Sequence, residues 1–192
     1  MNRNLLLLAL LGCASAMADS SVKSLNNADI QDSGTQYRGN FNVNQAAGDQ
    51  QQQTNVRAIA IGTEAGATTI VNQRLNTPAN PSMNATATIG GTSFSNGNGV
   101  LGVNQSAGAN TQQANALSIT LSAQPQSIDD SVLLQQNVAL INSSDPSDSS
   151  PGYRQVTTGD QAFTGSRGVI QLNQSAGVGN QTANTLSVRV AN

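Results

Sequence analysis

The sequence predicts an all-β fold in which three imperfect 23-residue strand-turn-strand repeats stack as a β-solenoid or cross-β unit, joined by flexible linkers. Three observations lead to this prediction. The same segment occurs three times without a gap, at 39–61, 99–121 and 168–190. Apolar residues alternate with period two inside each copy, which indicates strands. The 5 prolines all lie outside the copies, as expected if each backbone N–H within them has a partner.

The segments between the repeats differ in composition. They hold the prolines and most of the charges, and 145–152 has the composition of a loop. We therefore expect flexible linkers, with 69–72 and 132–141 as candidates for further strands; Phe94 and Phe163 lie at matching places before the second and third copies. The predicted organisation is a signal peptide at 1–18, an N-terminal segment at 19–38, repeat 1 at 39–61, linker 1 at 62–98, repeat 2 at 99–121, linker 2 at 122–167, repeat 3 at 168–190 and a C-terminal end at 191–192.

The N-terminus has the features of an export signal. Arg3 supplies a positive charge, residues 5–11 form an apolar run, and Ala16-Met17-Ala18 is a small-x-small cleavage site. The run is too short to span a bilayer. Leu10-Leu11-Gly12-Cys13 also resembles a lipoprotein cleavage box, in which Cys13 would be lipidated. Both interpretations predict export, and cleavage after Ala18 would leave no cysteine.

Each repeat is predicted to begin and end with a strand. The leading strands carry the apolar pairs Phe41 and Val43, Leu101 and Val103, and Ile170 and Leu172, and the closing strands carry Ile59 and Ile61, Ile119 and Leu121, and Val188 and Val190. An Ala-Gly pair between the two strands lets the chain change direction, because glycine tolerates positive φ. A tight hairpin and a β-arch both fit this spacing.

Recurrent amide side chains share a strand face with these aliphatic residues. Counting by twos places Gln105 with Leu101 and Val103, and Asn115 with Leu117 and Ile119. A buried amide without a partner costs about 1 to 3 kcal/mol, and in-register stacking supplies partners from the coils above and below. The predicted stacking residues are Asn44, Gln45, Gly48, Gln52, Asn55, Asn104, Gln105, Gly108, Gln112, Asn115, Asn173, Gln174, Gly177, Gln181 and Asn184.

Arg57 distinguishes the first repeat from the others. It occupies the position of Leu117 and Leu186 on the inward face. Because burial of an unpaired charge is costly, we expect repeat 1 to lie at an end of the stack, where its outer face can be polar.

Composition argues against catalysis and against several classes of ligand. Charged residues make up 9% of the chain, aromatic residues 3%, and the net charge of −2 offers no basic face for nucleic acid. The sequence has no histidine and one glutamate, Glu64. Asp129-Asp130 and the Asp145/Asp148 pair are best interpreted as solvated linker residues, and no Lys-Ser/Thr follows the glycines at 97–102. We predict no catalytic, cofactor-binding or metal-binding residues, no cofactor and no small-molecule substrate.

Three stretches carry a family resemblance. Residues 44–55 (NQAAGDQQQQTN), 104–115 and 173–184 resemble the repeats of the Pseudomonas functional amyloid (Fap) fibre proteins, which also run through Ala-Ala-Gly and Asn/Gln to an aliphatic tail. The resemblance implies that outer-membrane export machinery delivers the chain to the cell surface or beyond. The prediction that the chain is not an enzyme rests on its composition. The resemblance also implies assembly into cross-β fibres and a role in biofilm matrix and adhesion. Unpaired strand edges at the ends of the predicted stack would recruit further copies or related subunits by backbone hydrogen bonding, so we expect templated edge-to-edge addition.

The resemblance leaves several roles open. Major subunits of the family carry a Cys-x-Cys pair near the C-terminus, whereas this sequence ends Ser187-Val188-Arg189-Val190-Ala191-Asn192. A main fibre subunit, a minor subunit, a periplasmic assembly helper and a soluble β-solenoid adhesin are the alternatives.

Overall fold

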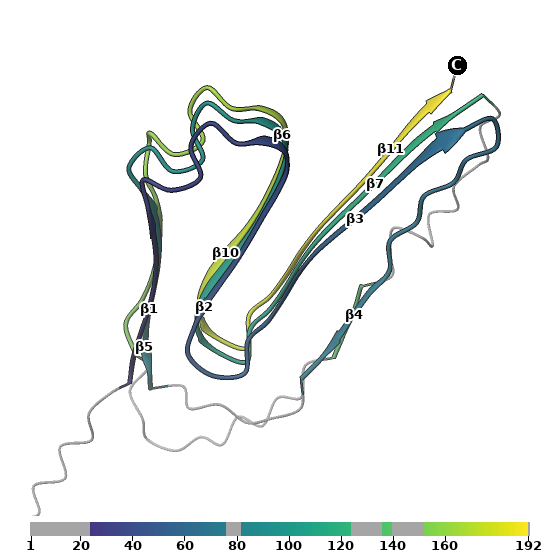
Figure 1. Ribbon diagram of the computed structural model, residues 1–192. Coiled ribbons are helices and arrows are strands. Elements are labelled where there is room, and N and C mark those ends of the chain that lie inside the picture. The colour runs from purple at the N-terminus through teal and green to yellow at the C-terminus, as the bar shows by residue number, and fades with distance from the viewer. Residues whose placement is uncertain (1–23, 76–81, 124–135, 140–151, 192) are drawn as a thin grey trace, which may run out of the picture.

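The computed structural model describes residues 24–75, 82–123, 136–139 and 152–191, and all regular structure within them is β-strand (Figure 1). The strands are β1 (Leu25–Gln31), β2 (Arg38–Ala47), β3 (Gln52–Gly62), β4 (Val71–Arg74), β5 (Asn84–Gly90), β6 (Asn98–Ala109), β7 (Gln112–Ser122), β8 (Gln136–Ala139), β9 (Arg154–Thr158), β10 (Arg167–Val178) and β11 (Gln181–Ala191). The predicted all-β class is therefore confirmed for these residues. They contain no helix with the length and hydropathy needed to cross a membrane.

The strands form four sheets, and every pairing is parallel. The sheet orders are β1-β5-β9, β10-β6-β2, β11-β7-β3 and β4-β8. We call β1–β4 coil 1, β5–β8 coil 2 and β9–β11 coil 3. Each sheet takes its strands from different coils, and the three ribbons in Figure 1 follow the same path side by side. Coil 2 is in the middle, so coils 1 and 3 carry the edge strands, which agrees with the end position expected from Arg57.

The register pairs residues of like type in neighbouring coils. Asn44 pairs with Asn104, and Asn104 with Asn173. The same register extends along the second strand of each coil, where Ile59, Ile119 and Val188 are paired. These neighbours are 60 and 69 positions apart in sequence. A slip by one residue would reverse the faces of every side chain, so the alternation of the sequence fixes this register.

The two strands of each repeat belong to different sheets. β2 hydrogen-bonds to β6, whereas β3 hydrogen-bonds to β7, so the chain between them is a β-arch rather than a hairpin. On the other face of the β3–β7 sheet, Gln73 on β4 donates to the carbonyl oxygens of Gln52 (3.3 Å) and Gln113 (3.1 Å). Each coil is therefore a serpentine of strands that meet through side chains (Figure 1).

The hydrophobic core lies between the β1-β5-β9 and β10-β6-β2 sheets. Its buried members include Ile89, Leu101 and Val103, and a second cluster consists of Ala28, Ala85, Ala87 and Ala107. Aromatic rings cross the coils at one end of this core: Phe94 stacks on Phe163 with centroids 5.4 Å apart and lies 6.4 Å from Phe41. Small alanines let the two sheets approach, and the rings fill the wider end.

The segments expected to be flexible linkers hold strands in their described parts. β4 and β5 fall within 62–98, and β8 and β9 within 122–167. β4 and β8 overlap the candidate strands at 69–72 and 132–141, whereas β1, β5 and β9 were not predicted. Ala85, Ala87 and Ile89 on β5 are fully buried, so the description of linker 1 as flexible is wrong here. Their alternation with Thr86 and Thr88 satisfies the strand pattern, but small residues weaken that signal.

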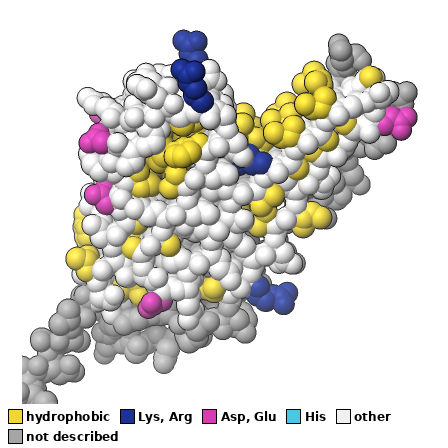
Figure 2. All heavy atoms as spheres, in the orientation of Figure 1, with side chains coloured by type: hydrophobic (Ala, Val, Ile, Leu, Met, Phe, Trp, Pro, Cys, Tyr) yellow, Lys and Arg dark blue, Asp and Glu magenta, His cyan; other side chains and the backbone are white. Residues whose placement is uncertain are grey.

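The far halves of β3, β7 and β11 expose an apolar face. Ile59 and Ile61 are 63% and 74% exposed, and Leu121 and Val190 are also exposed. The β3-β7-β11 sheet diverges from the β2-β6-β10 sheet beyond the arch (Figure 1), and Figure 2 shows apolar atoms along this arm. The predicted burial of these aliphatic residues therefore holds near the arch and fails toward the strand ends.

Candidate functional site

Two asparagine columns meet between the β2-β6-β10 and β3-β7-β11 sheets. The columns are Asn44, Asn104, Asn173 and Asn55, Asn115, Asn184. The Nδ2 of Asn104 donates to Oδ1 of Asn44 (2.9 Å), and the Nδ2 of Asn173 donates to Oδ1 of Asn104 (2.9 Å). The second column repeats these bonds at 2.9 and 3.1 Å. Within each coil it also donates to the first, at 2.7, 3.0 and 3.0 Å.

These bonds satisfy amides that are shielded from water. Asn104 and Asn115 are 0% exposed. Asn104 also donates to the carbonyl oxygen of Thr54 (2.8 Å), and its Oδ1 accepts from Asn115 and Asn173. A network in which every member is paired is both stabilising and specific, because any displacement leaves a buried polar group without a partner.

A glutamine column faces the opposite side of β6, in the core. Gln105 donates to Oε1 of Gln45 (2.8 Å) and to the carbonyl oxygens of Thr88 (2.7 Å) and Ala28 (3.2 Å). Gln174 in turn donates to Oε1 of Gln105 (2.8 Å). The column therefore joins coil to coil and also links β6 to the β1-β5 sheet.

Glycines at the start of the arch allow the backbones of neighbouring coils to approach. Gly48, Gly108 and Gly177 have φ of 106°, 119° and 131°, where side chains are strained. A Cβ on Gly48 would lie 2.0 Å from the carbonyl oxygen of Gly108, and a Cβ on Gly108 would lie 1.9 Å from that of Gly177. These positions need glycine for the turn and also for the coil-to-coil spacing.

The remaining predicted column is less regular. The side-chain amides of Gln52 and Gln112 lie 2.9 Å apart, and Gln181 pairs with Gln112 through the backbone register. The adjacent Gln53 and Gln113 were not among the predicted stacking residues, although counting by twos from Leu121 places Gln113 on the same face as Asn115. Gln53 donates to Oε1 of Gln113 (2.9 Å), and Gln113 donates to the hydroxyl of Ser175 (3.1 Å). Coil 3 carries Thr182 at this position, which explains why the shared pattern did not include it.

Arg57 lies on the inward face without a partner among the described residues. Its three guanidinium nitrogens are shielded and make no hydrogen bond, and burial lowers the pKa of the group. A Cβ on Gly102 would lie 2.5 Å from one of these nitrogens, so Gly102 provides the space for the guanidinium.

On the exterior, the N–H and hydroxyl of Thr92 donate to the Asp32 carboxylate and hold its pKa below the usual value.

We expect the substitution Arg57→Leu to stabilise the chain. Leucine is the residue of coils 2 and 3 at this position, and it removes buried donors that cost about 1 kcal/mol or more. The measurement is the thermal midpoint followed by circular dichroism. Arg74→Leu, at an exposed position of β4, is the control for loss of a charge. A lower thermal midpoint for Arg57→Leu than for the wild type would contradict the interpretation that the buried guanidinium is destabilising.

No catalytic constellation is evident in the described part of the chain. None of its groups of His, Cys, Asp and Glu side chains reaches the three members that could hold a metal ion. The aspartates considered from the sequence, Asp129, Asp130, Asp145 and Asp148, lie outside the described residues. The predicted cleavage sites before Cys13 and after Ala18 lie outside them as well.

Comparison with known proteins identifies the family. The functional amyloid protein FapB/FapC family matches residues 13–191, which is most of the chain. The chain belongs to this family. A FapB/FapC relative, the functional amyloid subunit FapC of Pseudomonas aeruginosa, is 34% identical over 110 residues, covering 54% of this chain and 32% of the relative. The match thus spans about a third of the relative's length. No solved structure matches.

The resemblance inferred from the repeats is thus confirmed as membership of the FapB/FapC family. The coils of this member bring the fifteen residues singled out from the sequence into neighbouring positions, column by column. They also add a glutamine pair and an aromatic column that the repeat frame did not include. The aromatic column was detectable only through the matching places of Phe94 and Phe163.

Proposed function

We propose that the chain is a structural subunit that forms or joins amyloid-like fibres, in which the coil 3 edge of one copy pairs with the coil 1 edge of the next. The observation that carries this proposal is that both asparagine columns end in asparagine at each of the two edges. Asn44 and Asn55 lie at one edge and Asn173 and Asn184 at the other, so head-to-tail addition would repeat the rungs already present within one chain. Unpaired strand edges recruit further strands in this way.

The biological setting follows from the same proposal. The relative is named a functional amyloid subunit, and we extend that role to this chain: export through the outer membrane after removal of the leader at 1–18, and action in biofilm matrix and cell adhesion at the cell surface. The fifteen column residues would serve stacking, and no catalytic step is assigned to any of them. Each repeat would act as one structural unit with the strands before and after it in its own coil, so that the coil boundaries fall inside the predicted linkers.

Fibre formation by the purified chain is the direct test. We expect spontaneous fibrils that give cross-β diffraction, with the strand spacing of about 4.7–4.8 Å along the fibre axis. A persistent monomer that delays the fibrillation of a FapC subunit would instead identify an assembly helper. A sharply melting monomer without effect on fibres would identify a soluble adhesin scaffold, and both outcomes would overturn the proposal.

Two glycines at the ends of the stack predict end-specific termination. Within one chain, a Cβ on Gly39 would meet nothing within 4 Å, and one on Gly177 would meet only side-chain atoms, at 3.0 Å or more. Across a head-to-tail junction the internal geometry would place the Gly177 Cβ against the carbonyl of the next copy's residue 48. The Gly39 Cβ would meet the previous copy's residue 168 in the same way. We therefore expect Gly177→Ala to cap the coil 3 end and Gly39→Ala the coil 1 end.

The measurement follows the elongation of single fibres from wild-type seeds. The seeds are placed in wild-type monomer that contains a small fraction of variant monomer. Each variant should stop growth at one end of the fibre, and the two variants together should stop growth at both ends. The elongation rate at a blocked end should fall by more than about tenfold, because backbone atoms cannot move aside as a side chain can. Gly66→Ala, where a Cβ has open space and φ is not positive, is the control. Normal growth in the presence of both variants would contradict head-to-tail stacking.

A further inference from the structure

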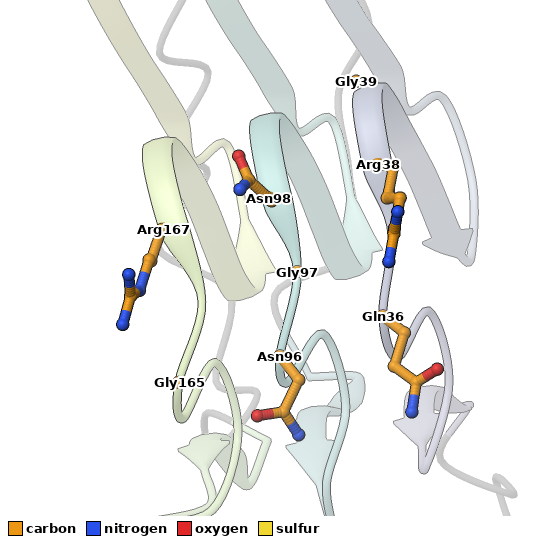
Figure 3. Close-up of a pocket in the computed structure, with 8 residues that line it drawn as sticks. All are labelled: Gln36, Arg38, Gly39, Asn96, Gly97, Asn98, Gly165 and Arg167. Carbon is orange, nitrogen blue, oxygen red and sulfur yellow. The ribbon is translucent and has the colours of Figure 1, made fainter.

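A polar groove crosses all three coils where the chain enters β2, β6 and β10. It has a volume of about 700 Å³, and Figure 3 shows most of its lining residues in two rows along the stacking direction. The first row is Arg38, Asn98 and Arg167, which are paired in register. The second row is Gln36, Asn96 and Gly165. The groove therefore runs across the strands, parallel to the axis along which coils stack.

The backbone holds both rows in place. The N–H of Asn98 donates to the carbonyl oxygen of Tyr37 (2.7 Å), and the N–H of Arg167 donates to that of Gly97 (2.9 Å). The N–H of Asn96 donates to the carbonyl oxygen of Thr164 (2.9 Å). Because strand spacing is about 4.8 Å, Arg38 and Arg167 are anchored roughly 9.6 Å apart on a rigid scaffold.

The groove is a cationic strip on a chain whose net charge is −2. Arg38 and Arg167 are both exposed, and no acidic side chain is among the described residues that line the groove. Neither guanidinium forms an ion pair with any residue that the structure describes, so both forks are available to a ligand. The lining also contains no aromatic side chain.

We propose that this groove binds a linear carboxylated polysaccharide lying along the stacking axis. The guanidinium fork matches a carboxylate in geometry and charge, and the amides of Gln36, Asn96 and Asn98 can donate to and accept from sugar hydroxyls between the two charges. Single-stranded nucleic acid binds with its bases stacked on aromatic side chains, which the groove lacks. The chemistry therefore favours an acidic sugar polymer.

Assembly would extend the site, a step that rests on the proposed function. Head-to-tail stacking would bring Arg167 of one copy within about one strand spacing of the next copy's Arg38. Two guanidiniums at that distance repel each other, and a carboxylate between them turns the repulsion into attraction. The fibre would then carry a continuous anion-binding groove along its length.

Fluorescence anisotropy with labelled polygalacturonate, on the soluble chain and on fibres, tests the proposal. The double variant Arg38→Asn/Arg167→Asn places in coils 1 and 3 the residue that coil 2 already has. We expect its affinity to fall by about tenfold or more, since each arginine loses a charge-assisted hydrogen bond. Arg74→Ala/Arg189→Thr removes the same charge elsewhere, again with coil 2 residues, and should stay within about twofold of the wild type.

The outcomes are distinct. Loss confined to the groove variant, together with no binding of neutral dextran, would support the site. Equal weakening in both double variants, no binding by the wild type, or tighter binding of a single-stranded oligonucleotide would overturn it. Binding to the soluble chain is measured before any fibre forms, so failure of this proposal leaves fibre growth intact, and failure of head-to-tail stacking leaves the binding measurement interpretable.

Discussion

The substitution Asn104→Asp is expected to prevent the coils from stacking at neutral pH. It replaces the Nδ2 donor by an oxygen that faces Oδ1 of Asn44 and the carbonyl oxygen of Thr54. The side chain is 0% exposed. The new carboxylate oxygen would therefore find neither a water molecule nor a hydrogen-bond donor to replace the two bonds that Nδ2 donates. A buried uncompensated charge costs about 3 to 5 kcal/mol, a large part of the stability of a chain of this size.

Acid should partly restore this variant. Burial raises the pKa of the new carboxyl above its unfolded value of about 3.9, so stability is lost as pH rises above that value and recovers as pH falls through the raised pKa. The protonated acid is neutral, and its O–H can donate to one of the two facing oxygens.

Chemical denaturation and fibre yield at neutral pH and at about pH 3.5 measure the effect, with the lower value chosen to protonate the unfolded carboxyl. Asn40→Asp, at an exposed position of β2, adds the same charge and should behave like the wild type. Equal losses in the two variants, or a loss independent of pH, would show that the asparagine columns do not hold the coils together.

The substitution Gly108→Ala is expected to separate coil 3 from coil 2. Its Cβ would lie 1.9 Å from the carbonyl oxygen of Gly177 and 2.7 Å from the carbonyl carbon, and both atoms belong to the backbone. The φ of 119° adds conformational strain that alanine would have to bear. We expect a loss of more than about 3 kcal/mol, beyond the usual range for a single substitution.

Hydrogen exchange locates this effect. Amides of β10 and β11 should lose protection, while the pairing of β2 with β6 away from the arch keeps its protection. Gly66→Ala is the matched control, because a Cβ there meets nothing within 4 Å and should change stability by about 0.5 kcal/mol or less. Unchanged protection of β10 in Gly108→Ala would mean that the close approach of the glycines is not required for stacking.

The sequence was sufficient for the strands of the repeats and the faces of their side chains. Alternation alone placed Gln105 with Leu101 and Val103, and the structure has all three side chains buried on β6. The family followed from the Asn, Gln and Gly positions. These features are local, so a single copy of the repeat already contains them.

Features that depend on a partner strand could not be derived in the same way. The spacing around Gly108 fits a hairpin and an arch equally, and only pairing with another coil distinguishes them. β1, β5 and β9 differ too much in sequence to be aligned without their register. The glycine was predicted for its turn, whereas its contact with the carbonyl of Gly177 arises only once two coils are side by side.

Parallel pairing between coils also determines how quickly the chain can fold. Paired residues of neighbouring coils lie 59 to 69 positions apart in sequence, so a loop of about that length must close before any ladder hydrogen bond forms. Such closure has an entropic cost that hairpins avoid, and folding slows as the separation between partners grows. Closure within one chain is first order, whereas pairing between chains is second order and offers the same rungs. Concentration therefore decides which reaction is faster, and dilution favours completion of three coils on a single chain before it meets another.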